Sequence, residues 1–191
     1  MRLGILGGTF DPIHLGHLYL AKKVLQGLSL DKVIFIPTYL PPHKKNVRIS
    51  SDKHRYRMVK LAIANEKRFA VSNIEIKRKG RSYSVETLRR LRKRYGPSTQ
   101  IFFITGSDSL KDLGKWKDLE EILGLCRFVV VKRPRHRIKK IPRNFIVLDI
   151  DAKDISATDI RARIRKGRAA EKFLPKNVSS CIKKHKLYSG S

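Results

Sequence analysis

A short strand that leads through a glycine pair into a helix constrains this chain more than any other stretch. Residues 3–6 form an apolar run that indicates a strand. Gly7 and Gly8 end the run, because paired glycines let the backbone turn sharply and leave no Cβ in the way of a close ligand. A helix is predicted to begin near Leu15. The N–H groups and the dipole of its first turn point at the bend, so the sequence predicts an anion site there.

Two histidines stand at this bend. His14 and His17 are three residues apart, so both can face the same way. The pattern predicts a phosphate site whose donors are cationic or neutral near pH 7. Two other interpretations stay open: a tight strand–helix turn with two polar caps, and a zinc site, for which the chain offers no matching cysteine or carboxylate cluster. The turn fits neither the GxGxxG loop nor the Gly-Lys-Ser/Thr loop.

The stretch at residues 7–17, Gly-Gly-Thr-Phe-Asp-Pro-Ile-His-Leu-Gly-His, resembles the signature of the nucleotidyltransferase superfamily that carries the HxGH motif. The residues of this stretch are most similar to those of the bacterial nicotinate-mononucleotide adenylyltransferases. The resemblance implies that both histidines stabilise charge during catalysis. It also implies an ATP site that includes Gly7, Gly8, Thr9, Phe10 and His17. Asp11, the nearest carboxylate, is expected to cap the turn.

A second motif lies at residues 155–161, Ile-Ser-Ala-Thr-Asp-Ile-Arg. Ser156 at the helix N-cap and Asp159 three residues later resemble a capping box, with Asp in place of Glu or Gln. By this local pattern alone the motif is a helix start. A helix N-terminus also binds anions, and an arginine one turn in can reach a phosphate.

The same stretch resembles the superfamily's second signature, usually Ile-Ser-Ser-Thr-x-Ile-Arg. The resemblance implies that Ser156, Thr158 and Arg161 hold the β and γ phosphates of ATP, and that Arg161 joins the histidines in catalysis. Ala157 stands where a second serine is common, so one hydroxyl is missing while the backbone N–H remains.

The acceptor is expected to bind past two other strand ends. His43 and Lys44 end a proline-stiffened basic loop, which is either an exposed charged loop or, as the resemblance implies, part of the site for the mononucleotide phosphate. Residues 106–109 followed by Trp116 resemble the Gly-x-Asp-Ser…Trp stretch of the nicotinate branch. The resemblance places Asp108, Trp116 and Lys117 at the substrate.

Residues 81–88 resemble that branch's Ser-Tyr-Thr-x-x-Thr-Leu, with Ser84 in place of threonine. The resemblance implies that Thr87 and the backbone after Trp116 face the nicotinate carboxylate, and that Trp116 stacks on the pyridine ring. A lone tryptophan is otherwise a core residue. Backbone N–H donors suit a carboxylate and not a carboxamide nitrogen, which favours the acid as substrate.

Apolar strands that alternate with helices predict an α/β fold, a Rossmann-like three-layer sandwich around a mainly parallel sheet. We expect a single domain over residues 1–191, with a helical part at about 155–188 packed on it. Ser84 is expected to cap a helix. Residues 174–188 resemble the C-terminal end of the nicotinate branch, and we interpret this stretch as a packing helix without a chemical role. Strands are expected at residues 3–6, 31–37, 69–76, 100–105, 127–132 and 145–148.

The chain is strongly basic, with 44 Lys and Arg against 16 Asp and Glu and a formal net charge of +28. Such a field attracts nucleic acid, ATP and mononucleotides alike. Without zinc-finger spacing, an RNP-like motif or a basic zipper, specific nucleic-acid recognition is not expected, although the charge can give loose binding. Cys126 and Cys181 are expected to be reduced thiols in a cytoplasmic protein. No stretch has the length of a membrane span, and homo-oligomerisation stays open.

Together the motifs imply an adenylyltransferase in which a mononucleotide phosphate attacks the α-phosphorus of ATP and releases pyrophosphate. With nicotinate mononucleotide, the product is nicotinate adenine dinucleotide, in NAD biosynthesis. Mg²⁺ is expected to arrive with ATP and not in a protein-built cage. Rival acceptors are nicotinamide mononucleotide and phosphopantetheine. The rival from another class is a non-catalytic nucleic-acid-binding protein.

Overall fold

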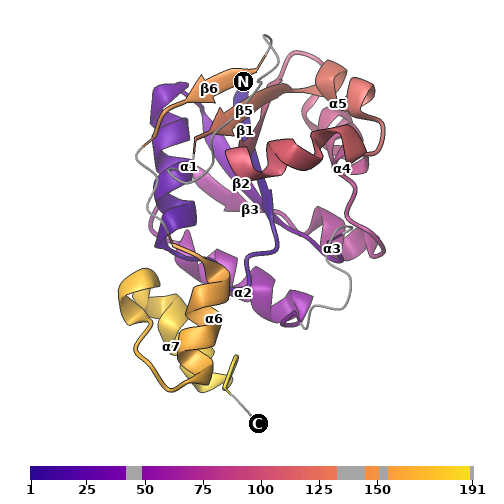
Figure 1. The fold of residues 1–191 in the computed structure, drawn as a ribbon. Helices are drawn as coiled ribbons and strands as arrows, with labels where there is room; N and C mark the ends of the chain where they lie inside the picture. Colours follow the sequence, from indigo (N-terminus) through magenta and orange to yellow (C-terminus); the bar gives the residue numbers. More distant parts are fainter. Residues whose placement is uncertain (42–48, 133–144, 151–154, 190–191) are drawn as a thin grey trace.

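The computed structural model describes residues 1–41, 49–132, 145–150 and 155–189, without the side chains of residues 108, 109, 111 and 112. Its strands form a six-stranded sheet in the order β3-β2-β1-β4-β5-β6, and every pairing is parallel (Figure 1). The strands are β1 (Arg2–Gly8), β2 (Lys32–Pro37), β3 (Phe69–Val71), β4 (Gln100–Gly106), β5 (Arg127–Val131) and β6 (Ile146–Leu148). The predicted α/β class with a mainly parallel sheet is confirmed.

Helices connect the strands and cover both faces of the sheet, as parallel connections require. They are α1 (Leu15–Gly27), α2 (Asp52–Ala62), α3 (Ile74–Arg78), α4 (Ser84–Tyr95), α5 (Leu119–Leu125), α6 (Ala157–Arg165) and α7 (Lys176–Lys184), with short 3-10 segments η1 (Ser107–Lys115) and η2 (Glu171–Phe173).

Side chains of β2 show how the sheet is buried on both sides. Val33 and Phe35 belong to the apolar cluster under α1, α2 and α7, whereas Ile34 and Ile36 belong to the cluster under α4 and α5. All four are buried, because successive side chains of a strand point to opposite faces. This alternation into two cores produces the three-layer sandwich.

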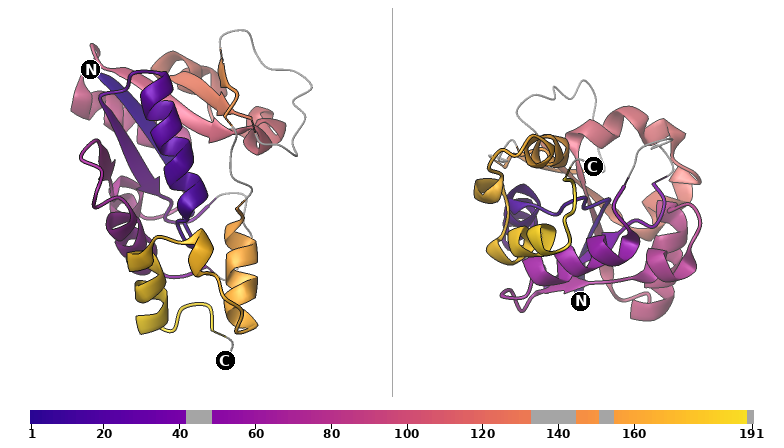
Figure 2. Two further views of the ribbon diagram at one scale, coloured as in Figure 1. Left: turned by 90° about the vertical axis from the view of Figure 1, so that its left-hand side faces the viewer. Right: turned by 90° about the horizontal axis from the view of Figure 1, so that it is seen from below.

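The strand order reverses direction at β1, which pairs with β2 on one side and β4 on the other. Loops that leave the carboxyl ends of these strands go to opposite faces, which opens a crevice between them. The C-terminal helices α6 and α7 lie beyond this end of the sheet, with α7 beside α2 (Figure 2). The Asn177 side chain donates to the carbonyl of Leu61, which ties α7 to α2.

The strand predicted at residues 69–76 is wrong in its second half. β3 ends at Val71, and α3 begins at Ile74. β3 is an edge strand that pairs only with β2, and β2 ends at Pro37, which has no N–H to continue the ladder. The chain therefore leaves the sheet and forms a short helix.

Two local expectations also differ. Gly7 and Gly8 remain in extended β1, and the left-handed residue of the turn is Phe10, with φ of 49°. The N-cap of α4 is Tyr83 and not Ser84, because the N–H of Thr87 donates to the carbonyl of Tyr83, which places Ser84 inside the helix.

Both cysteines are free and buried, as expected. Burial raises the pKa of Cys126 to about 12. None of the helices in the described part of the chain is long and apolar enough to span a membrane.

Leu25 offers a test of the core between α1 and the sheet. Its side chain is fully buried, so Leu25→Ala should lower the free energy of unfolding by about 2–5 kcal/mol in urea titrations. Leu40→Ala is the matched control, because that side chain is 47% exposed. Equal losses in the two variants would contradict the assigned core.

Candidate active site

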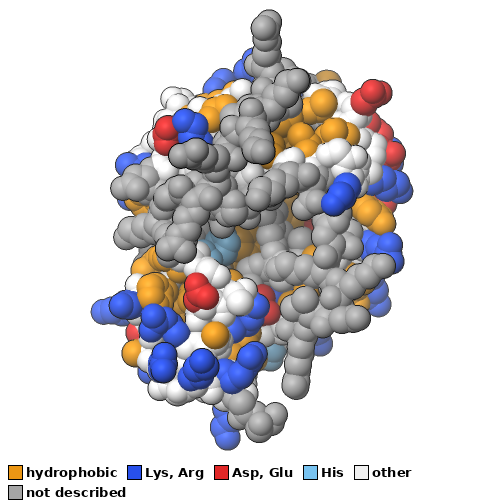
Figure 3. Space-filling model, in the orientation of Figure 1, with side chains coloured by type: hydrophobic (Ala, Val, Ile, Leu, Met, Phe, Trp, Pro, Cys, Tyr) orange, Lys and Arg blue, Asp and Glu red, His pale blue; other side chains and the backbone are white. Residues whose placement is uncertain are grey.

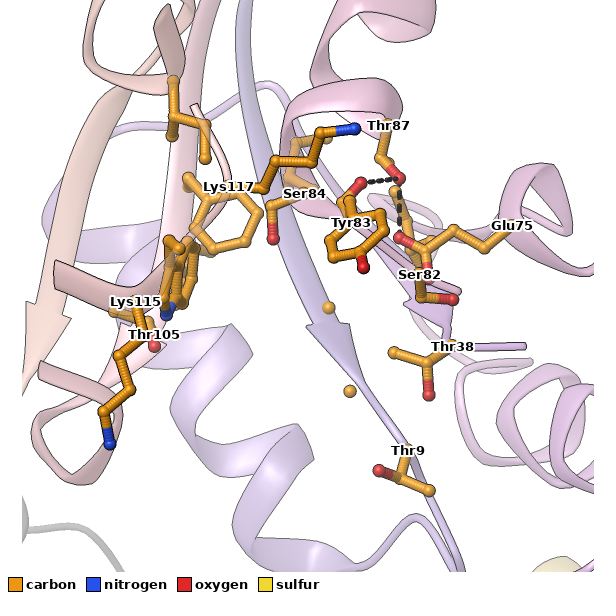
Figure 4. A pocket seen from close by; sticks show the side chains of 18 residues that line it. Thr9, Thr38, Glu75, Ser82, Tyr83, Ser84, Thr87, Thr105, Lys115 and Lys117 are labelled. Atoms are coloured by element: carbon orange, nitrogen blue, oxygen red, sulfur yellow. Dashed lines mark hydrogen bonds between the residues drawn. The ribbon is translucent and has the colours of Figure 1, made fainter. Parts of the chain in front are cut away.

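A cavity of about 280 Å³ opens at the carboxyl ends of β1, β2 and β4, where the strand order reverses (Figure 4). Gly7, Gly8 and Thr9 form one part of its wall. The opposite parts come from the start of α4 and from the end of η1. The polar side chains that line it are Thr9, Thr38, Glu75, Ser82, Tyr83, Ser84, Thr87, Thr105, Lys115 and Lys117.

The glycine pair leaves room for two different things. A Cβ added at Gly7 would meet no atom within 4 Å, so the absence of a side chain at this position leaves open space in the cavity. A Cβ at Gly8 would lie 3.0 Å from the ring of Phe10, so this glycine accommodates that ring. Phe10 is 2% exposed and belongs to the core, so contacts with a ligand can come only from its main chain.

His14 and His17 lie together at the start of α1. Their rings stack with centroids 3.7 Å apart, and the rings of Phe10 and His17 pack edge to face with centroids 5.1 Å apart. The Nδ1 atom of His17 accepts a hydrogen bond from the N–H of His14 at 3.3 Å. The proton of a neutral His17 ring is therefore on Nε2, which makes Nε2–H a donor.

Gly16 lets the helix start pack closely against His14. A Cβ at Gly16 would lie 3.1 Å from Nδ1 of His14 and 3.5 Å from Cβ of Ile155. The two sequence motifs, which are far apart in the chain, thus meet at this point.

Arg161 completes the junction of the motifs. Its Nη1 atom donates to the main-chain oxygen of Asp11 at 2.7 Å, and its Nη2 atom donates to Oγ1 of Thr158 at 3.3 Å. Oγ of Ser156 accepts from the N–H of Asp159 at 3.4 Å, so this hydroxyl caps α6 as the sequence predicts. A cation and a helix N-terminus therefore stand beside the histidines.

Of the residues expected at the substrate, the structure brings Thr87, Trp116 and Lys117 to one cavity. Trp116 also packs against Phe103 and Phe128, at 5.7 and 5.8 Å between centroids, so it is both a core residue and part of the wall. The ammonium group of Lys117 lies 5.1 Å from the ring centroid of Tyr83. The side chains of His43, Lys44 and Asp108 lie outside the described residues.

Glu75 is a buried wall residue that the sequence did not predict. Its carboxylate accepts a hydrogen bond from the hydroxyl group of Thr87 at 2.7 Å (Figure 4). The residue is 6% exposed. Burial raises the pKa of Glu75, although hydrogen bonds from Ser82 and Thr87 favour the charged form. In the expected strand this residue would have alternated away from its apolar neighbours. Helix α3 turns it inward.

The turn at residues 9–12, after β1, has a second support that no motif indicated. Arg55 of α2, 2% exposed, donates to the carbonyls of Thr9, Ser50 and Tyr39 at 2.8, 2.9 and 3.2 Å. Asp11 does not cap the turn as expected, because its carboxylate is bonded to Ser50 and Tyr188. Both contacts are distant in sequence, so local pattern gives no signal for them.

No three His, Cys, Asp or Glu side chains within the described ranges gather as a group that could hold a metal ion.

Comparisons with known proteins agree with this geometry. Residues 5–163 match the cytidylyltransferase-like family model. A probable nicotinate-nucleotide adenylyltransferase from Thermoanaerobacter sp. (strain X514) is 42% identical over 199 residues, which covers 98% of this chain and 94% of the relative. The chain belongs to this nucleotidyltransferase family.

One further relative and one solved structure extend the comparison. A probable nicotinate-nucleotide adenylyltransferase from Tropheryma whipplei (strain Twist) is 46% identical over 184 residues, covering 96% of this chain and 97% of the relative. The nicotinic acid mononucleotide adenylyltransferase of Plasmodium falciparum, solved in complex with NaAD, superposes with a TM-score of 0.79 at 19% identity, covering 98% of this chain and 97% of that one. This structure shows the shared fold.

Glu75→Gln tests whether the charge of the buried carboxylate opposes folding. Because the pKa is raised from its ordinary 4.5, the group's contribution to stability is fully present below pH 4.5 and is lost as the pH rises through the higher folded-state pKa. The variant should therefore melt above the wild type at pH 7–8 and close to it at pH 4. Glu120→Gln, at an exposed site on α5, should show no such difference. A Glu75→Gln variant that is less stable at pH 8 than at pH 4, relative to wild type, would contradict this assignment.

Proposed function

We propose that the enzyme transfers the adenylyl group of ATP to nicotinate mononucleotide, giving nicotinate adenine dinucleotide and pyrophosphate in NAD biosynthesis. The observation that carries the proposal is the meeting of the two motifs through Arg161 and Asp11, two residues after Thr9, which lines the same cavity as Thr87 and Trp116. The names of the relatives, at over 40% identity across nearly the full chain, support the same reaction.

The reaction needs alignment and charge neutralisation. An oxygen of the mononucleotide phosphate forms a bond to the α-phosphorus of ATP, while the bond from that phosphorus to the bridging oxygen breaks and pyrophosphate leaves. Negative charge builds on the transferring group and on pyrophosphate. We assign its stabilisation to His14, His17 and Arg161, with Nε2–H of His17 as one donor.

The ATP site follows from the same geometry. Gly7, Gly8 and Thr9 line the cavity just before the chain enters α1, and we assign them to ATP. Phe10 is buried and contributes only main-chain atoms. The α6 start, with Thr158 next to Arg161 and Ser156 at the N-cap, is assigned to the terminal phosphates. Ser156 supports this site as a cap, since its hydroxyl already accepts a backbone N–H.

The acceptor ring is assigned to the cavity. Trp116 offers a ring at its wall, and the backbone at Lys117 follows directly. The hydroxyl of Thr87 already donates to Glu75, so Thr87 shapes the wall and orients its neighbours. The roles of His43 and Lys44 at the acceptor phosphate, and of Asp108, stay predictions.

Mg²⁺ is proposed to bind through the ATP phosphates and water, since hard oxygen ligands suit it and it retains waters readily. When bound, it neutralises phosphate charge. We further propose that residues 1–191 act as one nucleotidyltransferase domain, in the cytoplasm. Homo-oligomerisation stays open.

The basic side chains are spread unevenly over the face of the molecule drawn in Figure 3. Lys and Arg side chains gather over α6 and α7 on the face drawn in Figure 3. A field of this sign favours anionic substrates and can give loose nucleic-acid binding, which stays a prediction.

His17→Ala should lower turnover by roughly 10²–10⁴-fold, the range for a lost transition-state donor. Pyrophosphate release from ATP and nicotinate mononucleotide measures it. His54→Ala is the matched control, because His54 lies on α2 against His185 and outside the site. Near-normal turnover of His17→Ala would remove His17 from the mechanism.

The acceptor is tested by running nicotinate and nicotinamide mononucleotide side by side with ATP and Mg²⁺. We expect a strong preference for the acid, because backbone N–H donors can pair with a carboxylate but not with an amide nitrogen. Equal turnover of the two mononucleotides would be consistent with adenylyl transfer but would contradict the proposed ring site. If neither mononucleotide gives pyrophosphate, the proposed acceptor is contradicted.

A further inference from the structure

The carboxylate of Asp11 joins the phosphate turn to the end of the chain. Asp11 is 4% exposed. Its Oδ1 atom accepts a hydrogen bond from the hydroxyl group of Tyr188 at 2.6 Å, and its Oδ2 atom accepts one from the N–H of Ser50 at 3.3 Å. Tyr188 is 177 positions away in sequence. The tail therefore bonds to the residue that directly follows the ATP-binding turn.

The main chain of the same residue orients Arg161. The guanidinium of Arg161 donates to the carbonyl oxygen of Asp11 at 2.7 Å and not to its carboxylate. Both oxygens of that carboxylate already have donors, from Tyr188 and Ser50. Tyr188 thus occupies an acceptor atom that would otherwise attract Arg161.

The tail has a defined conformation that directs Tyr188 to this position. His185 is the C-cap of α7, and Lys186 after it is left-handed, with φ of 48°, and donates its N–H to the carbonyl of Lys183. The N–H of Leu187 donates to the carbonyl of Ile182, which completes a Schellman motif. Tyr188 is again left-handed, with φ of 66°. Two left-handed non-glycine residues within three positions cost free energy and persist where the surrounding structure holds them.

The hydroxyl of Tyr188 remains a donor at all physiological pH values. Burial, followed by the nearby charge of Asp11, raises the pKa of Tyr188 far above its ordinary value of 10. Arg55 anchors the surroundings through the carbonyls of Thr9 and Ser50. The contact between tail and turn is therefore partly buried, and its surroundings are held by hydrogen bonds.

We propose that Tyr188 is a positioning residue for adenylyl transfer: by occupying the carboxylate of Asp11, it keeps the guanidinium of Arg161 directed at the ATP phosphates. Without that hydroxyl, the buried carboxylate captures Arg161, and the resulting ion pair withdraws positive charge from the nucleotide. The last turn of the chain is then part of the active site although it touches no substrate. The inference rests on the proposed assignment of Arg161 to ATP.

The test is a double-mutant cycle on Tyr188→Phe and Arg161→Ala, read by equilibrium binding of MgATP in a calorimeter and by turnover. Tyr188→Phe alone should weaken MgATP binding or lower turnover by about 10–100-fold, the range for a lost hydrogen bond to a charged group. In the Arg161→Ala background the same change should have less than about a two-fold effect. Tyr95→Phe, on α4 and away from the turn, is the matched control and should behave as wild type.

A rescue variant separates this role from a packing role. Asp11→Asn keeps an acceptor oxygen but carries no charge, so it cannot capture Arg161. Adding Asp11→Asn to Tyr188→Phe should recover at least half of the lost MgATP affinity on a logarithmic scale. The same rescue decides the question if Tyr188→Phe alone folds poorly, because the double variant removes the unpaired buried charge.

Two results would overturn the proposal: wild-type MgATP binding and turnover in Tyr188→Phe, or losses that simply add in the Arg161→Ala background. MgATP binding requires no acceptor, so a wild-type enzyme that binds MgATP but makes no product from nicotinate mononucleotide contradicts only the proposed function.

Discussion

The position of β1 at the centre of an all-parallel sheet is the constraint on which the rest of the structure depends. Because β2 and β4 flank it on opposite sides, the chain that leaves β1 must pass through the crevice where the strand order reverses. Its next segment is the start of α1, with His14 and His17. The fold thereby delivers backbone N–H groups, a helix N-terminus and two imidazoles to one edge of the sheet.

Buried charges then fix the shape of that edge. Arg55 holds the carbonyl of Thr9, and Asp11 holds Ser50 and the tail. A buried ion is costly unless its hydrogen-bonding capacity is filled, so each of these groups determines where its partners lie. The turn at residues 9–12 is consequently held by partners that are distant from it in the sequence. Tyr188, in the turn that follows α7, supplies one of those partners.

Much of the fold and part of the site were predictable. Apolar runs such as residues 33–36 and 127–131 predicted buried parallel strands, because only a strand covered on both faces is continuously apolar. The motif histidines and Arg161 were predicted, and the structure brings them to one junction. The alternation at 69–76 misled, because Pro37 of the neighbouring strand ends the ladder that this segment needed.

The sequence by itself determined the secondary structure of the core, the chemistry of the two motifs and the family of the chain, since these depend on local spacing and residue type. The tertiary structure alone decided which distant groups meet. It turned Glu75 into the cavity wall, placed Arg55 under the turn and brought Tyr188 to Asp11. Such contacts arise where the ends of elements converge on a shared buried volume, and no periodicity within either partner encodes them.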